Sequence, residues 1–258
     1  FLNVQKKLTL QKKYKIKIAF IDTGCDISHS FFNDYSIKCI DVDYKKNSLD
    51  SCGHGTFFAS VLCKYLLVNK ESIELISIKA SDSHQIAIEN VCKGIEIAIK
   101  EKADVLNIGV CNSNYDKKMA QLIKKAVDSG IIVIAPAGNN VKGVNLYPAS
   151  LSTVISCAAI DSTGKIAHFS NVNDSVDIAV PGENIKGILT SGQAERMKLS
   201  LDEKNMVACS GTSFAAGILT AAAALIKLVD KNITYKQFRD ILYTQNQIKC
   251  NVNFKNIY

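Results

Sequence analysis

Arginine is nearly absent from this chain, although the chain is basic. Of its 258 residues, 31 are lysine or arginine and 24 are acidic, which gives a formal net charge of +7, and Arg196 and Arg239 are the two arginines. Proteins that read nucleic acids rely on the forked guanidinium group for base and phosphate contacts. We therefore expect no nucleic-acid partner.

The lysines are scattered, apart from a basic N-terminal segment at residues 1–14 and the positions just after it. The cluster consists of Lys6, Lys7, Lys12, Lys13, Lys15 and Lys17. A run of like charges is most simply a solvated face. The alternative is a docking surface for an acidic peptide.

Paired cysteines are missing too. The chain has 9 cysteines, an odd number, and no Cys-x-x-Cys pair, which argues against a disulfide framework and against a zinc ribbon. Cys63 and Cys157 stand in apolar runs, so we expect small buried side chains there. This usage favours a reducing, cytoplasmic setting. No signal peptide is visible, but the chain begins at Phe1, so secretion after removal of a leader stays open.

Long apolar runs, internal repeats and linkers rich in Pro or Gly are also absent. The longest uncharged apolar stretch, residues 213–226, is shorter than the roughly 20 residues that cross a bilayer, so we expect no membrane span. Hydrophobic residues make up 47% of the chain and charged residues 21%, enough to build a substantial core. We expect a single domain over residues 1–258, a monomer, with an exposed polar loop at 191–205.

Apolar strands alternate with amphipathic helices across the first half of the chain. The patterns predict strands at 15–22, 73–79, 104–110, 131–135, 153–159 and 176–180, and helices at 54–68, 86–100, 117–128, 214–229 and 235–242. The fully apolar run at 131–135 is typical of a parallel strand covered on both faces. Such alternation predicts an α/β fold with a doubly wound, mostly parallel sheet between two helical layers.

Three polar residues fall where sheets of this kind place their sites, at the carboxyl ends of strands. Asp22 ends the first strand, His54 begins the next helix between two glycines, and Asn139 follows the apolar strand. Each has a plain structural alternative, since Asp22 could cap a turn, His54 could be a structural histidine and Asn139 could be a loop residue.

Ser213 stands at the start of the long alanine-rich helix. Unpaired N–H groups and the helix dipole favour negative charge there, which suits a nucleophile that must support an oxyanion. By itself this serine could be only a helix cap. Together, however, a hydroxyl, an imidazole, a carboxylate and an amide donor are the groups that acyl transfer requires.

The motifs around these four residues resemble those of subtilisin-like serine proteases. They read Ile21-Asp22-Thr23-Gly24-Cys25-Asp26, Gly53-His54-Gly55-Thr56-Phe57-Phe58-Ala59-Ser60, Ala137-Gly138-Asn139-Asn140 and Ser210-Gly211-Thr212-Ser213-Phe214-Ala215. Their order, Asp, His, Ser, is the order known for subtilisin. The resemblance implies that Ser213 is the nucleophile, His54 the general base and Asp22 its orienting partner. It also implies an oxyanion hole formed by the Asn139 side chain and the Ser213 N–H group.

The same resemblance implies a serine endopeptidase that binds its peptide substrate as an added strand. The pairing edge would be Ile108, Gly109 and Val110. The pocket for the residue before the cleaved bond would be lined by Ala135, Pro136, Ala137 and Gly138. Neither segment carries a charge, so an apolar or uncharged residue is expected there. Family members that remove leaders from lanthipeptide precursors, or that act inside cells, suggest a peptide-processing or an intracellular role.

The chain departs from the family pattern at several positions. Phe214 replaces a Met, Gly217 a Pro and Gly109 a common Ser. No loop rich in Asn and Gly precedes the strand that begins at Ile73, so we expect no tight calcium site and no required cofactor. A weaker ion site or a solvated acidic loop could be formed by Asp41, Asp43 and Asp50.

Other functions fit fewer residues. Asp22-Thr23-Gly24 is also the aspartic-protease triplet, but that mechanism needs a second carboxylate of the same kind. The glycines around His54 and the turn before Ser213 could hold a phosphate, but the expected lysine and downstream acid are missing. The alternative left open is a protein of the same fold that binds peptides without cutting them.

Overall fold

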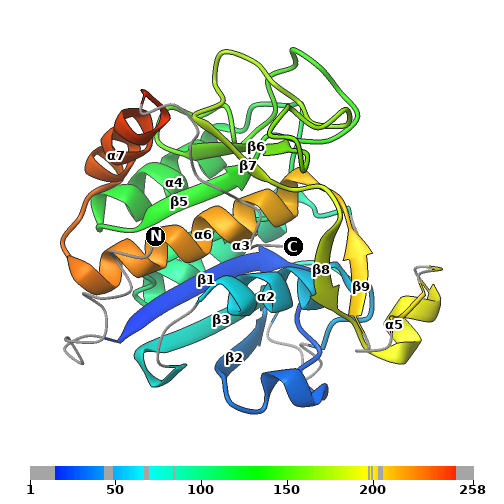
Figure 1. Cartoon of the computed structure of the whole chain (residues 1–258). Helices are drawn as coiled ribbons and strands as arrows, with labels where there is room; N and C mark the ends of the chain where they lie inside the picture. The colour runs from blue at the N-terminus through cyan, green and yellow to red at the C-terminus, as the bar shows by residue number, and fades with distance from the viewer. Residues whose placement is uncertain are drawn as a thin grey trace.

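A parallel sheet forms the centre of the molecule (Figure 1). The computed structural model describes residues 15–43, 49–66, 70–83, 85–196, 198, 200–202 and 206–247, so the basic segment at 1–14 lies outside the described residues. Within them, seven strands pair in the order β2-β3-β1-β4-β5-β6-β7. Their bounds are β1 (Ile16–Asp22), β2 (Ser36–Asp41), β3 (Ile73–Lys79), β4 (Val105–Ile108), β5 (Ile132–Pro136), β6 (Ile155–Ile160) and β7 (Ile178–Pro181).

Helices cover both faces of this sheet. On one face lie α2 (His54–Tyr65) and α6 (Thr212–Val229), and on the other α3 (Ile88–Lys100) and α4 (Lys117–Asp128) (Figure 1). The remaining elements are the antiparallel pair β8 (Ile185–Ile188) and β9 (Met206–Cys209), the helices α5 (Ser191–Arg196) and α7 (Tyr235–Gln247), and the short η1 (Ser30–Phe32) and η2 (Lys70–Ser72). The predicted doubly wound α/β/α fold is confirmed.

The apolar pattern of the sequence explains the central layer. In β1, every residue except Lys17 is buried, and the strand lies between β3 and β4 in parallel register, with Ile21 opposite both Ile78 and Ile108. Because its two neighbours and both helical layers shield it from water, β1 ends at Asp22 in a buried position. The first strand thus delivers a carboxylate to the carboxyl edge of the sheet.

Phe58 anchors the core under α2 and α6. Its side chain is 0% exposed, its ring centroid lies 5.3 Å from that of Phe20, and a Cβ built on Gly217 would lie 3.2 Å from the Phe58 ring. The glycine that departs from the family pattern therefore makes room for a phenylalanine that packs against the first turns of α6.

A third apolar cluster joins the starts of α2 and α6 to the β8–β9 hairpin. Its buried members are Phe57, Val61, Ile185, Leu189, Ala194, Val207, Phe214 and Ile218. The expectation of an exposed loop at 191–205 is therefore wrong for its first part. Residues 191–196 form α5, and Gln193 and Ala194 are 0% and 2% exposed because they pack against this cluster and against the loop before α2.

The helix α6 is apolar because it is a core helix. Among the described residues it is the one helix with the length and hydropathy to cross a membrane, with a mean hydropathy of 1.8, and 83% of its residues are buried within the fold. Its alanines allow close approach to the strands beneath it. Its composition is thus accounted for by packing.

The eight cysteines within the described residues are all free. Cys63 and Cys157 are 1% and 0% exposed, as expected from their apolar surroundings. Burial raises the pKa of both thiols, because the charged thiolate is disfavoured away from water. In this part of the chain these two cysteines act as small apolar side chains.

We expect Phe58→Ala to lower the free energy of unfolding by about 3–5 kcal/mol, because it leaves a cavity between Phe20 and Gly217. Urea unfolding followed by circular dichroism measures this change. Ile241→Ala, at a side chain that is 37% exposed on α7, is the control and should change stability by no more than about 0.5 kcal/mol. Equal effects of the two substitutions would contradict the packing described here.

Candidate active site

Asp22 and His54 form a hydrogen-bonded pair at the carboxyl edge of the sheet. Asp22 Oδ1 lies 2.7 Å from His54 Nδ1 and also accepts a hydrogen bond from Thr23 N at 2.7 Å. The Asp22 side chain is 2% exposed and that of His54 17% exposed. Since the carboxylate is shielded and the imidazole is reachable, the pair can present a polarised imidazole to a molecule outside.

The second oxygen of Asp22 faces Gly109. Within the part of the chain that the structure describes, Asp22 Oδ2 is buried and has no hydrogen-bond partner. A Cβ built on Gly109 would lie 2.6 Å from this oxygen. The glycine that stands in place of the family's serine thus leaves the carboxylate room but supplies no donor to it.

The buried carboxylate of Asp50 caps the helix that begins with His54. Its Oδ1 atom accepts hydrogen bonds from Cys52 N at 2.9 Å and Gly53 N at 2.8 Å. Its Oδ2 atom accepts from Thr56 N at 2.8 Å and from Thr56 Oγ1 at 2.7 Å. These contacts satisfy N–H groups at the helix start that have no partner within the helix.

The expectation of a solvated acidic loop at Asp41, Asp43 and Asp50 is therefore wrong for Asp50, which is 3% exposed, while the weaker ion site stays a prediction. Asp43 forms an ion pair with Lys93 at 2.9 Å. Among the described residues, no group of three or more His, Cys, Asp or Glu side chains is arranged to hold a metal ion. The backbone donors around Asp50 explain why that carboxylate is buried.

Ser213 is the second residue of α6 and is partly exposed. The next residue, Phe214, is buried, and its ring centroid lies 5.6 Å from the His54 ring and 4.5 Å from the Phe57 ring. This aromatic contact holds the start of α6 against the start of α2. It brings the residues that flank Ser213 beside His54, although the two helices begin 158 positions apart in the sequence.

The Asn139 side chain is oriented by the first residue of α6. Its Oδ1 atom accepts hydrogen bonds from Thr212 N at 2.9 Å and Thr212 Oγ1 at 3.0 Å. Because a backbone N–H can only donate, the amide oxygen must face Thr212, and the Nδ2 group points elsewhere. A Cβ built on Gly211 would lie 3.6 Å from that Nδ2 atom. The amide donor is thus held beside the turn that precedes Ser213.

Sequence reasoning missed two residues that build this corner. Thr212 lies inside the serine motif, and its position beside Asn139 became clear only in the fold. Asn171 is 0% exposed, and its Nδ2 group donates to Ala137 O and Val144 O, both at 2.8 Å. It fixes the loop that carries Asn139. None of the four motifs around the candidate residues includes Asn171, so the sequence carried no signal for it.

The pKa of His54 is raised above its ordinary value. Burial lowers this pKa, but the negative charge of Asp22, the hydrogen bond to Asp22 and the charge of Asp50 together raise it by more. The surroundings therefore stabilise the imidazolium form. That is the form a general base takes after it accepts a proton.

The predicted substrate-binding residues are only partly at the surface. Ile108 and Ala135 are 0% exposed and belong to the core under α3 and α4, so their side chains do not line a surface pocket. Gly109 and Val110 are partly exposed. Pro136, Ala137 and Gly138 are buried, and what they offer a ligand is their backbone.

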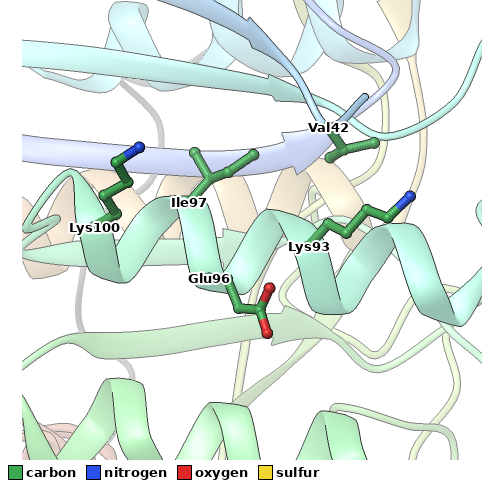
Figure 2. Close-up of a pocket in the computed structure, with 5 residues that line it drawn as sticks. All are labelled: Val42, Lys93, Glu96, Ile97 and Lys100. Atoms are coloured by element: carbon green, nitrogen blue, oxygen red, sulfur yellow. The ribbon is translucent and has the colours of Figure 1, made fainter. Parts of the chain in front are cut away.

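A separate surface pocket of about 300 Å³ lies on the other side of the sheet, along α3 (Figure 2). It is lined by Val42, Lys93, Glu96, Ile97 and Lys100. None of these residues belongs to the four motifs around Asp22, His54, Asn139 and Ser213. The chemistry-bearing side chains therefore lie away from this pocket, at the carboxyl edge of the sheet.

Comparison with known proteins gives a family match over most of the chain. Residues 13–255 match the subtilase family. The chain belongs to the subtilase family. The major intracellular serine protease of Bacillus subtilis (strain 168) is 28% identical to this subtilase over 233 residues, which cover 84% of this chain and 69% of the relative. Subtilisin NAT of Bacillus subtilis subsp. natto is 30% identical over 237 residues, covering 88% of this chain and 59% of that protein.

Solved structures of other proteases share the fold. A cold-adapted subtilisin-like serine proteinase superimposes with a TM-score of 0.76 at 22% identity, covering 90% of this chain and 82% of that one. The prenylagaramide maturation protease PagA gives a TM-score of 0.73 at 23% identity, covering 97% and 89%. At these identities the likeness concerns the fold.

Asp22→Asn should lower the pKa of His54. Removing the negative partner leaves burial, the largest influence on this pKa, opposed by the smaller effect of the Asp50 charge, so this pKa should fall below the ordinary value of about 6.5. Titration of the His54 ring by NMR in the Ser213→Ala background measures it, with Asp34→Asn, an exposed carboxylate, as the control.

The raised pKa of His54 also makes the stability of the fold depend on pH. Because the pKa of His54 is raised in the folded chain, the pair should stabilise the fold fully below about pH 6.5 and lose that contribution as the pH rises through the folded-state value. An unchanged His54 pKa in Asp22→Asn would contradict the electrostatic role given to Asp22.

Proposed function

We propose that this subtilase is a serine endopeptidase that cleaves peptide bonds through an acyl-enzyme intermediate. Ser213 is the nucleophile, His54 the general base and then the general acid, and Asp22 the carboxylate that holds the imidazole. Asn139 Nδ2 and the Ser213 N–H group donate to the oxyanion. The observation that carries the proposal is the 2.7 Å contact between the buried Asp22 carboxylate and His54 Nδ1, beside a helix start that also orients Asn139.

The chemistry follows from these positions. With Nδ1–H donated to Asp22, the imidazole offers its other nitrogen to the Ser213 hydroxyl as a proton acceptor. The Ser213 oxygen attacks the carbonyl carbon, and the two donors stabilise the resulting negative oxygen. His54 then gives its proton to the departing amine, and water repeats the sequence on the acyl-enzyme.

The substrate backbone would pair with the segment after β4. Gly109 N donates to Ile21 O at 3.1 Å, which extends the sheet by one bond. No hydrogen bond within the described residues engages the backbone of Val110, so its N–H and carbonyl are available to an added strand. The preceding residue, Gly109, lies against Asp22 Oδ2, so the added strand would run beside the Asp22 carboxylate.

The residue before the cleaved bond would be small and uncharged. A Cβ built on Gly138 would clash with the Leu146 side chain and would lie 3.7 Å from Cys111 Sγ. Cys111 is exposed, and its Sγ lies 3.2 Å from Pro136 O. Leu146 and Cys111 therefore occupy the space beside the segment that is proposed to line the pocket.

A restricted pocket favours a dedicated processing role over general digestion. One neighbour in fold is named a maturation protease, and this chain carries an excess of lysine that would attract acidic leader peptides. A cytoplasmic location and a monomeric state stay predictions. The other candidate function is a peptide-binding protein of the same fold without hydrolytic activity.

Ser213→Ala should abolish both hydrolysis and labelling by a fluorophosphonate while leaving the thermal unfolding midpoint near that of the wild type. Loss of the nucleophile costs on the order of 10⁶-fold in kcat, a magnitude known for subtilisin itself. Mass spectrometry of the labelled chain, with Ser162→Ala as the matched surface control, locates the adduct. A folded wild type that forms no adduct at Ser213 would favour the binding protein.

Leu146→Ala should widen the range of residues accepted before the cleaved bond. We expect a gain of about 10-fold or more in kcat/KM for a peptide with Leu or Phe at that position relative to one with Ala, since each buried methylene contributes about 0.8 kcal/mol. Profiling with a peptide library that varies only this position measures it, with Leu151→Ala as the control. A wild type that already prefers large residues would contradict the restricted pocket.

A further inference from the structure

Gln193 is a buried polar residue with no part in the proposed chemistry. It lies in α5, a short helix in the connection between β8 and β9, and is 0% exposed. Its Oε1 atom accepts a hydrogen bond from Thr190 N at 3.0 Å. Because the Thr190 N–H can only donate, this bond fixes which way the amide faces, and the Nε2 group must point toward α2.

The Nε2 group of Gln193 makes two contacts with the segment that introduces His54. It donates to Asp50 O at 2.8 Å and to Thr56 Oγ1 at 3.1 Å. Residues that are 143 and 137 positions away in the sequence are thus joined through one amide. A second contact from α5, Arg196 Nε to Ser51 O at 3.0 Å, reaches the same segment.

The Thr56 hydroxyl is the point where these contacts meet. It donates to Asp50 Oδ2 at 2.7 Å and accepts from Gln193 Nε2 at 3.1 Å and from Asp26 N at 2.9 Å. A hydroxyl has one donor and two acceptor positions, so all of them are used. Without Gln193, the Asp50 carbonyl and the Thr56 hydroxyl would each lose a partner in a site from which water is excluded.

His54 depends on this network because it is the first residue of α2. Asp50 accepts hydrogen bonds from Gly53 N, just before His54, and from Thr56 N, two residues after it, so these contacts fix the direction of the helix start. Apolar packing alone leaves such a start free to rotate slightly, and a catalytic imidazole must be held to within about 0.5 Å of its working position.

We propose that Gln193 is a positioning residue that locks the first turn of α2 and thereby holds the His54 imidazole against Asp22. The inference rests on the proposed function, since His54 is given its role there. In this account α5 is an auxiliary element of the active site, although it contributes no group to the reaction. Its docking is supported by Ala194, which packs in the same apolar cluster as Phe57 and Phe214.

Gln193→Met keeps the length and approximate volume of the side chain and removes its hydrogen bonds. In the full chain we expect kcat for a peptide substrate to fall about 10-fold or more, with KM changed by less than about twofold, because misplacement by a fraction of an ångström affects the reacting geometry more than binding. Gln121→Met, an exposed glutamine on α4, is the matched control and should leave both constants unchanged. If Gln193→Met does not fold, Gln193→Asn withdraws the amide by one methylene and serves as the same test.

A second readout does not require hydrolysis. In the Ser213→Ala background, the His54 Nδ1–H proton that is shared with Asp22 should give a downfield NMR resonance, and Gln193→Met should broaden it or move it upfield. The titration of His54 should shift at the same time. The groups that face it are Asp22 at the end of β1 and Asp50 and Cys52 before α2.

The two readouts separate this inference from the proposed function. A wild type that neither hydrolyses peptides nor reacts with a fluorophosphonate would overturn the function, while the resonance would still test the positioning. Conversely, Gln193→Met with unchanged kcat, KM and His54 resonance, and only a lower unfolding midpoint, would show that Gln193 stabilises the fold and positions nothing.

Discussion

The hydrogen bond between the buried Asp22 carboxylate and His54 Nδ1 is the interaction on which this site depends. The Asp22 carboxylate is 2% exposed, and burying a charge destabilises the fold unless the charge is paired or hydrogen-bonded. The fold imposes this burial, because β1 lies between two parallel neighbours and ends at Asp22. The imidazole compensates part of it, and in return its pKa is raised and its ring orientation is fixed. The contacts of Phe214, Thr212 and Asp50 fix the two helix starts and the Asn139 amide that lie around this pair.

Two kinds of contact keep the helix starts together. Apolar packing does so broadly, since Phe214 touches both the His54 and Phe57 rings and belongs to the cluster under the β8–β9 hairpin. Directional hydrogen bonds then set the details. Thr212 orients Asn139 at the start of α6, and Asp50 caps the start of α2. Phe214, which stands where the family has a Met, fits this packing role, because its larger ring contacts both helix starts at once.

Much of this arrangement could be predicted from the sequence, for reasons that are local. The strand at 73–79 and the helix at 117–128 have the predicted bounds because each carries a continuous periodic pattern. Asp22, His54, Asn139 and Ser213 stand at element ends, where the chain order of the motifs suffices to find them. By contrast, β2 was missed because its side chains are mostly half-buried and alternate weakly. The burial of Asp50 and Gln193 depends on a hydrogen bond between residues 143 positions apart. The contact of Leu146 with Gly138 is also made only in the folded chain. Neither could be predicted from a local sequence pattern.

The central claim is that four distant segments form one acyl-transfer site. Its most direct test is to mix the enzyme with an activated ester of a short peptide, stop the reaction with acid within milliseconds, and map any covalent acyl group by mass spectrometry. The account predicts an acyl group on the peptide that contains Ser213, formed in a burst and suppressed by His54→Ala. Turnover without an acyl group on Ser213, or an acyl group that forms equally well in His54→Ala, would contradict it.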